Sequence, residues 1–130
     1  MRWKIRMLKE AKADFDALDG SQKSIVRKAL IKVSKNPLPA TEGGYGKPLG
    51  SHNDSNLTGL LKVKLKKYGI RIVYKIFKCK ETMVIVVIGM RSDRDAYDTA
   101  NSRMHGYQGT DALDAATEKI TDENTEPGGA

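Results

Sequence analysis

Apolar and basic residues alternate strictly in the middle of the chain. Within residues 60–67, Lys62, Lys64 and Lys66 are separated by apolar residues. Successive side chains of a β-strand point to opposite faces. The stretch therefore predicts a strand with one cationic face, suited to an anion, and one apolar face that packs against a core.

Two further strands and a helix are predicted after this one. Residues 70–77 alternate again and place Arg71 away from the isoleucine face, so two adjacent strands bring cations together. Residues 83–88 are apolar at every position, which is typical of a central strand buried on both faces. After Arg91, a helix is expected from Ser92 to about residue 103, with an acidic first turn that suits its N-terminus.

The first third of the chain predicts a strand and two helices. Residues 2–7 alternate between basic and apolar side chains, as in a strand with one basic face. Apolar spacing then changes to the helical three-and-four step and stops at residues 19–20, after which Ser21 is expected to cap a second helix ending before Asn36. Residues 37–59 are rich in glycine and proline and predict a long loop, with an irregular element near 45–49.

These elements predict an α+β fold in the order β-α-α-β-β-β-α. Its sheet should be small and mostly antiparallel, with the αα-hairpin packed on one face. The chain length suits one domain and a tail. We place the domain at residues 1–103 and expect residues 104–130 to be an acidic, disordered tail, in which residues 112–120 could form a marginal amphipathic helix.

Charge is distributed unevenly between these two parts. Residues 1–103 hold 22 basic and 10 acidic side chains, a net charge of +12, whereas residues 104–130 hold one basic and six acidic side chains. Such a basic domain favours a polyanionic partner, with nucleic acid ahead of acidic protein. A solvated basic surface without a specific partner stays open.

The cysteine content, the N-terminal sequence and the acidic residues restrict the expected cellular compartment and the expected metal or disulfide sites. The single Cys79 argues against a disulfide framework and against a cysteine-based zinc site. No signal-peptide core and no membrane-length apolar run is present, so we expect a cytoplasmic protein without a membrane partner. We expect no metal and no cofactor, because Asp93, Asp95 and Asp98 are explained as the acidic first turns of a helix.

If the polyanion is RNA, the cations suggest a reaction. Cleavage without a metal requires a base for the 2′-OH proton, cations that neutralise the phosphorane, and a proton donor for the 5′-oxygen. Lys62, Lys64, Arg71, Arg91 and Tyr97 provide such groups, since cations beside a phenol favour its ionised form. Packing of the Tyr97 ring on the sheet and a merely solvated lysine face are the structural alternatives.

Three stretches resemble the RelE toxins of the RelE/ParE superfamily: residues 59–65, 68–74 and 88–93, the last followed by Tyr97. The resemblance covers about residues 2–103. Its more specific part is the set Lys62, Lys64, Arg71, Arg91 and Tyr97, which matches the RelE catalytic set position by position. The long 37–59 loop and the acidic tail depart from the family pattern.

The resemblance implies a type II toxin that cleaves mRNA in the ribosomal A site, against 16S rRNA, and leaves a 2′,3′-cyclic phosphate. A cognate antitoxin protein is the implied second partner. In that scheme Tyr97 is the general base, Arg71 stabilises the transition state, Arg91 assists the leaving group, and Lys62 and Lys64 bind the phosphate. Further RNA contacts are expected from other basic side chains: Lys4, Arg6, Lys66, Lys67 and Arg94.

Three other functions remain open on sequence alone. A ParE-like toxin shares the strand pattern but poisons DNA gyrase through protein contacts and needs no nuclease site. A catalytically inert module would only bind RNA or an antitoxin. A ribonuclease with paired histidines would use His52 and His105, the two histidines of the chain.

Overall fold

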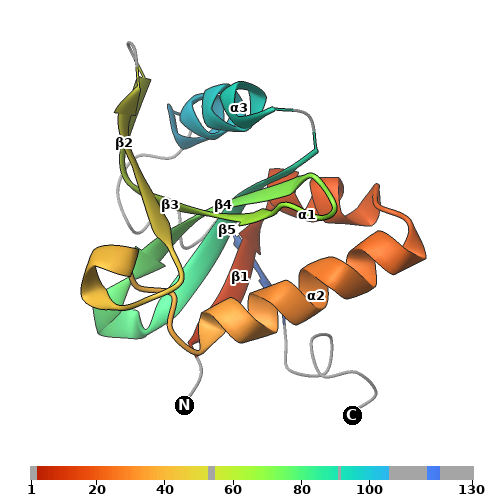
Figure 1. The fold of residues 1–130 in the computed structure, drawn as a ribbon, viewed down its shortest axis with the longest axis horizontal. Helices are drawn as coiled ribbons and strands as arrows, with labels where there is room; N and C mark the ends of the chain where they lie inside the picture. Colours follow the sequence, from red (N-terminus) through yellow and green to blue (C-terminus); the bar gives the residue numbers. More distant parts are fainter. Residues whose placement is uncertain (1–2, 53–54, 91, 106–116, 121–130) are drawn as a thin grey trace.

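The computed structural model describes residues 3–52, 55–90, 92–105 and 117–120. The α+β class predicted from the sequence is confirmed (Figure 1). Its elements follow in the order β1 (Lys4–Leu8), α1 (Lys9–Asp16), α2 (Gly20–Ser34), η1 (Ala40–Glu42), β2 (Lys47–His52), β3 (Ser55–Leu65), β4 (Ile70–Phe77), η2 (Lys78–Lys80), β5 (Thr82–Gly89), α3 (Asp93–His105) and β6 (Thr117–Ile120). None of the described helices combines the length and the apolar character that a membrane crossing needs.

The strands form one sheet in the order β2-β3-β4-β5-β1-β6. Neighbouring strands pair antiparallel except β1 and β5, which run parallel. The parallel pair requires a crossover, and the two helices together with β2, β3 and β4 supply it. The consequence is that β3 and β4, which carry most of the predicted site, lie side by side and two to three strands away from β1.

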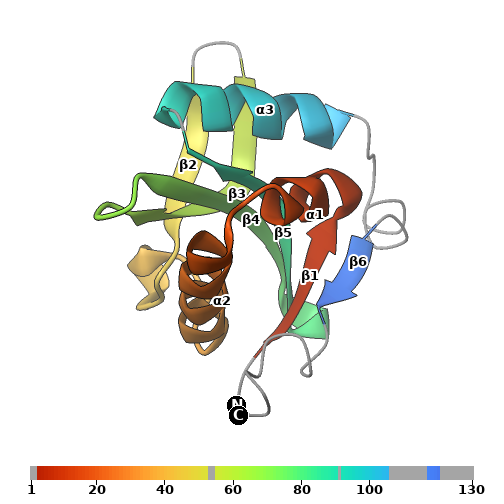
Figure 2. The ribbon, with the colours of Figure 1, turned by 90° about the vertical axis from the view of Figure 1, so that its right-hand side faces the viewer.

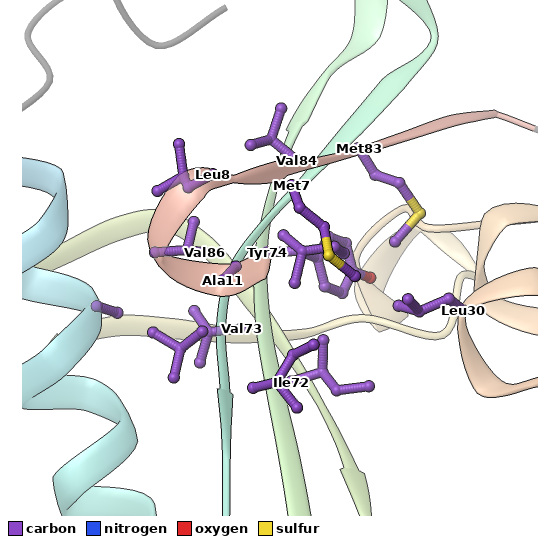
Figure 3. Packing of buried hydrophobic residues seen from close by; sticks show 14 of the residues in the cluster. Met7, Leu8, Ala11, Leu30, Ile72, Val73, Tyr74, Met83, Val84 and Val86 are labelled. Carbon is purple, nitrogen blue, oxygen red and sulfur yellow. The ribbon is translucent and has the colours of Figure 1, made fainter. Parts of the chain in front are cut away.

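The core fills both faces of this sheet. Every residue of β5 from Thr82 to Ile88 is buried, as the continuous apolar run predicts. On one face Met7, Tyr74 and Met83 lie around Leu30 of α2 (Figure 3). The third helix covers the opposite face, across β3, β4 and β5 (Figures 1 and 2). Lys62 of β3 faces this α3 side of the sheet, because its Nζ donates to the hydroxyl of Tyr97 in α3.

The N-cap of the second helix lies two residues before the predicted one. Its N-cap is Asp19 and not Ser21, because the Asp19 carboxylate accepts the backbone N–H of Gln22 while the Gln22 side chain accepts the N–H of Asp19. The Ser21 hydroxyl also donates to this carboxylate. These donors favour the ionised form and lower the pKa of Asp19. Apolar periodicity predicts the helix, but it does not show whether Asp19 or Ser21, two residues apart, caps it.

The predicted 37–59 loop contains more structure than expected. It holds η1, the edge strand β2 and the first residues of β3, so the loop prediction is wrong for these segments. The strand was missed because Pro48 and Gly50 lower its propensity, and pairing with β3 overrides that. A Cβ at Gly46 would lie 2.3 Å from the Tyr74 hydroxyl, which donates to Pro37 O at 2.8 Å. This close approach requires glycine.

Part of the predicted tail is also structured. Thr117–Ile120 form β6, antiparallel to β1 at the edge of the sheet opposite β2. Disorder and helix are therefore both wrong for these four residues, because the outer edge of β1 offers backbone hydrogen bonds that only a strand can use. Residues 106–116 and 121–130 lie outside the described part of the chain.

Candidate active site

A lysine and a tyrosine from distant parts of the sequence meet at the centre of the site. The Nζ of Lys62, in β3, donates to the hydroxyl of Tyr97, in α3, at 2.5 Å. The same Nζ is 5.1 Å from the ring centroid, which is about twice its distance to the hydroxyl oxygen. The ammonium therefore contacts the hydroxyl end of the side chain and not the face of the ring. Both residues are half-buried, and the ring packs against the core. The tyrosine therefore both packs on the sheet and presents its hydroxyl to a cation.

Two more cations lie in adjacent strands on the same face. Lys64 in β3 and Arg71 in β4 are register partners, and directly opposed residues of an antiparallel pair share a face. Lys64 is exposed, whereas Arg71 is half-buried and donates from Nη1 to Gly69 O at 2.9 Å. Lys62 lies two residues from Lys64 and so faces the same way. One surface thus carries a phenol and three cationic side chains.

The position of Tyr97 depends on how α3 begins and packs. The Ser92 hydroxyl accepts the backbone N–H of Asp95 at 3.1 Å, which caps the first turn of the helix that the sequence predicted to start here. Ala96 and Ala100 are buried, so this stripe of α3 faces the sheet. A Cβ at Gly89 would lie 3.8 Å from the Ala96 side chain, which shows how closely the helix approaches β5. Tyr97 follows Ala96 and turns toward β3.

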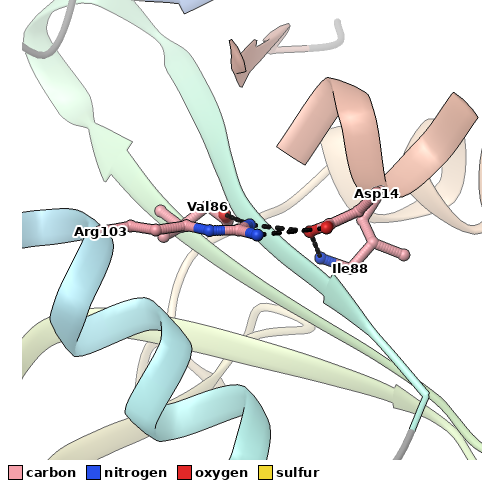
Figure 4. Close-up of polar contacts among 4 residues, drawn as sticks. All are labelled: Asp14, Val86, Ile88 and Arg103. Carbon is pink, nitrogen blue, oxygen red and sulfur yellow. Dashed lines mark hydrogen bonds and ion pairs between the residues drawn. The ribbon is translucent and has the colours of Figure 1, made fainter. Parts of the chain in front are cut away.

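An ion pair joins α3 to α1 and to the sheet. Arg103 of α3 donates to both carboxylate oxygens of Asp14 in α1, at 2.7 and 3.1 Å, and to Val86 O at 2.8 Å (Figure 4). The same carboxylate accepts the Ile88 N–H at 3.1 Å. The register between β4 and β5 shifts here and skips Val86, while β1 pairs with β5 only as far as Ile85. The pair therefore supplies hydrogen-bond partners for Val86 O and the Ile88 N–H, at the point where the β-bulge and the end of β1 interrupt the pairing of the sheet.

The chain is similar to known proteins in sequence and in structure. No family model matches it. A RelE-like toxin protein of Escherichia coli is 25% identical over 104 residues, which cover 80% of this chain and 99% of the relative. A RelE variant of E. coli with two arginines replaced, in the free state, matches with a TM-score of 0.62 at 20% identity, covering 80% of this chain and 99% of RelE. This chain has the fold of a RelE-type toxin. A chain of the Mycobacterium tuberculosis RelBE2 toxin–antitoxin complex matches with a TM-score of 0.58 at 23% identity, covering 72% of this chain and 95% of that one.

The resemblance to RelE inferred from the sequence is thereby confirmed, and the RelE-type fold separates the predicted RNA-binding residues into groups. Lys66 and Lys67 are exposed at the tip of the β3–β4 hairpin, next to the site. Lys4 and Arg6 belong to β1, which β4 and β5 separate from β3, so the fold does not bring them to Lys62. Arg94 is exposed on α3, where its Nε lies 3.4 Å from an Asp98 carboxylate oxygen. Arg91 lies outside the described residues.

One cation on the same face as Lys62 was not predicted. Lys47 in β2 is the register partner of Lys62, which places it on the same face as the candidate site. It is exposed. No alternation around residue 47 signalled a strand, so its neighbour across the sheet could not be inferred from the sequence.

A cavity among the described residues lies away from the Lys62–Tyr97 contact. It has a volume of about 360 Å³ and is lined by α1, the end of β5 and α3, with Asp14, Asp98 and Arg103 among its residues. Neither Lys62 nor Tyr97 lines it. The cavity therefore lies beside the Asp14–Arg103 pair and is separate from the Lys62–Tyr97 contact.

Proposed function

We propose that this protein is a type II toxin that cleaves mRNA in the ribosomal A site without a metal. The observation that carries the proposal is the hydrogen bond from Lys62 to the Tyr97 hydroxyl, on the face that also presents Lys64 and Arg71. A general base, and cations for a phosphorane, are the groups that metal-free RNA cleavage requires. The similarity to RelE-type toxins supports the same chemistry.

The proposed reaction is an in-line attack by the 2′-oxygen. Tyr97, as the phenolate, takes the 2′-OH proton, and the 2′-oxygen forms a bond to phosphorus while the bond to the 5′-oxygen breaks. Lys62 stabilises the phenolate before the proton transfer, and Lys64 and Arg71 neutralise the added charge on the phosphorane. Arg91 is assigned as the proton donor to the departing 5′-oxygen, so one proton leaves the 2′-OH for Tyr97 and one reaches the 5′-oxygen. The products are a 2′,3′-cyclic phosphate and a 5′-hydroxyl.

An antitoxin protein is the second proposed partner. One matched structure is described as a complex of a toxin with its antitoxin. The net charge of +12 on residues 1–103 favours an acidic or amphipathic segment that covers the cationic surface. Its association should weaken with salt, because dissolved ions screen the attraction between exposed charges on the two proteins.

The deciding experiment compares two targets. Primer extension on cellular mRNA after brief induction should reveal new 5′ ends within codons, and a Tyr97→Phe variant should not produce them. A ParE-like toxin would instead inhibit gyrase supercoiling in vitro and leave mRNA intact. A module that only binds RNA or an antitoxin would do neither, and either of these results would overturn the proposed function.

A further inference from the structure

The turn between β3 and β4 exposes an aromatic ring that the proposed mechanism does not use. Tyr68 is 44% exposed, and the only other large hydrophobic residues of the described chain that are comparably exposed are Tyr45 and Met90. Single exposed aromatics are common on protein surfaces, so exposure alone decides nothing. The surroundings of the ring are what distinguish it.

The sequence around this ring is basic and contains no acidic residue. Residues 55–80, which include both strands of the hairpin, contain eight basic residues and no acidic one. Lys66 and Lys67 are exposed in the same turn, and Lys67 Nζ lies 5.7 Å from the Tyr68 ring centroid. A π-face among cations is the combination that binds single-stranded nucleic acid, because the ring stacks on a base while the cations contact the phosphates.

The turn also holds the ring in a defined place relative to the candidate site. The Tyr68 N–H donates to Leu65 O at 2.9 Å, and Gly69 follows with a φ of 70°, which glycine adopts without strain. Gly69 O accepts Arg71 Nη1. One short segment thus positions both Tyr68 and the guanidinium assigned to the transition state. The hairpin projects from the body of the molecule, at the left of Figure 2.

We propose that Tyr68 stacks on an unpaired nucleobase of the RNA next to the cleavage site. This inference rests on the proposed function, and the base belongs either to the mRNA or to ribosomal RNA. An RNA strand satisfies the ring and the lysines together, one through a base and the others through phosphates. The carboxylates of an acidic peptide would pair with the lysines, but they do not stack on the ring. Tyr68 is a positioning residue here, since it does not touch the reacting atoms.

Binding to programmed ribosomes tests the stack without cleavage. The probe is an mRNA whose A-site codon carries 2′-O-methyl groups, so that no 2′-OH can attack. Tyr68→Ala should weaken binding roughly 5- to 150-fold, the range for loss of one aromatic–base stack. Tyr68→Phe, which keeps the ring, should bind as wild type. Tyr45→Ala is the matched control, because Tyr45 is 50% exposed and has Lys32 Nζ 5.5 Å from its ring centroid, and it should also bind as wild type.

Abasic substitutions in the mRNA identify the source of the base. If the stacked base is in the mRNA, one abasic position should weaken wild-type binding and leave Tyr68→Ala unchanged. If no abasic position affects either protein while Tyr68→Ala stays weak, the base belongs to ribosomal RNA. Tyr68→Ala that binds ribosomes as wild type would overturn the stack, and so would a defect confined to antitoxin binding.

Single-turnover cleavage of unmodified mRNA separates the two proposals. Tyr68→Ala should need more ribosomes for half-maximal rate, by the same roughly 5- to 150-fold, while the rate at saturation stays that of wild type. Wild-type protein that binds ribosomes through Tyr68 but cleaves nothing would contradict the proposed function alone. Cleavage that is indifferent to Tyr68→Ala would contradict the stack alone.

Discussion

Replacing Asp14 by alanine should destabilise the fold through three lost hydrogen bonds. The substitution removes the acceptor of two Arg103 bonds and of the Ile88 N–H, and it leaves Arg103 with Val86 O. The guanidinium then remains charged in a site where Arg103 and Asp14 have side chains only 18% and 22% exposed. A helix that carries Tyr97 loses its attachment to α1.

The size of the effect follows from the burial of the pair. A hydrogen bond to a charged group contributes about 1.5–3 kcal/mol, and removing one partner of a fully buried ion pair costs about 3–5 kcal/mol. Because water still reaches part of this pair and Val86 O still accepts from Arg103, we expect a loss of about 2–4 kcal/mol. That is a large fraction of the roughly 5–15 kcal/mol of a typical domain.

Urea unfolding measures this loss against a control on the same helix. With a slope of about 1.5–2 kcal/mol per molar urea, the midpoint should fall by about 1–2.5 M. Asp16→Ala removes an exposed pair with Lys12, whose side chains are 38% and 56% exposed, and should cost about 0.5 kcal/mol or less. Asp14→Ala combined with Arg103→Met should cost less than the sum of the single changes, because no unpaired charge remains. An Asp14→Ala midpoint no lower than that of Asp16→Ala would refute the reasoning.

Three further outcomes test the site and the helix cap. Tyr97→Phe removes the hydroxyl that would act as the base, so single-turnover cleavage should fall roughly 10²- to 10⁴-fold. The substitution keeps the ring packing, so folding and ribosome binding should stay intact. Cleavage at a near wild-type rate would exclude the tyrosine as base. Arg71→Ala should slow the chemical step at saturating ribosomes, whereas Lys66→Ala should mainly weaken ribosome association and reduce its salt dependence; equal rates at saturation for Arg71→Ala and wild type would count against the assigned role. The pKa of Asp19 is lowered in the folded state, so the ionised Asp19 cap stabilises the fold fully at a pH above the ordinary pKa of 3.8. This stabilisation is lost as the pH falls through the lowered pKa of the folded state. Thermal unfolding should therefore show wild type losing stability relative to Asp19→Asn only below about that pH, and parallel losses from neutral pH downward would contradict it.

Local patterns in the sequence determined the elements that carry the site. Alternation at residues 60–67 and 70–77 predicted β3 and β4 with their cations on one face, because side-chain direction in a strand depends only on sequence position. The continuous apolar run predicted the buried β5, because a strand covered on both faces has apolar residues at every position. The polar start at Ser92 predicted α3 and placed Tyr97 in its second turn.

Pairings between distant segments were decided only by the tertiary structure. Pro48 and Gly50 weaken the local strand signal of β2, and β6 has too few residues to show one, so both strands exist through their partners β3 and β1. The parallel pairing of β1 with β5 likewise follows from the crossover and not from alternation. Strand order then determined which predicted cations lie together, and it left Lys4 apart from Lys62.

Contacts between side chains depend on the same long-range geometry. The 2.5 Å approach of Lys62 to Tyr97 joins residues 35 positions apart, and the Asp14–Arg103 pair joins residues 89 positions apart. Sequence pattern supplies the residue types and the faces on which they lie. The packing of α3 against β3 and β5 brings the Tyr97 phenol next to the cations, and Arg103 helps hold α3 there through the bulge at Val86. Side-chain distances depend on how the elements pack and not on the periodicity within each element.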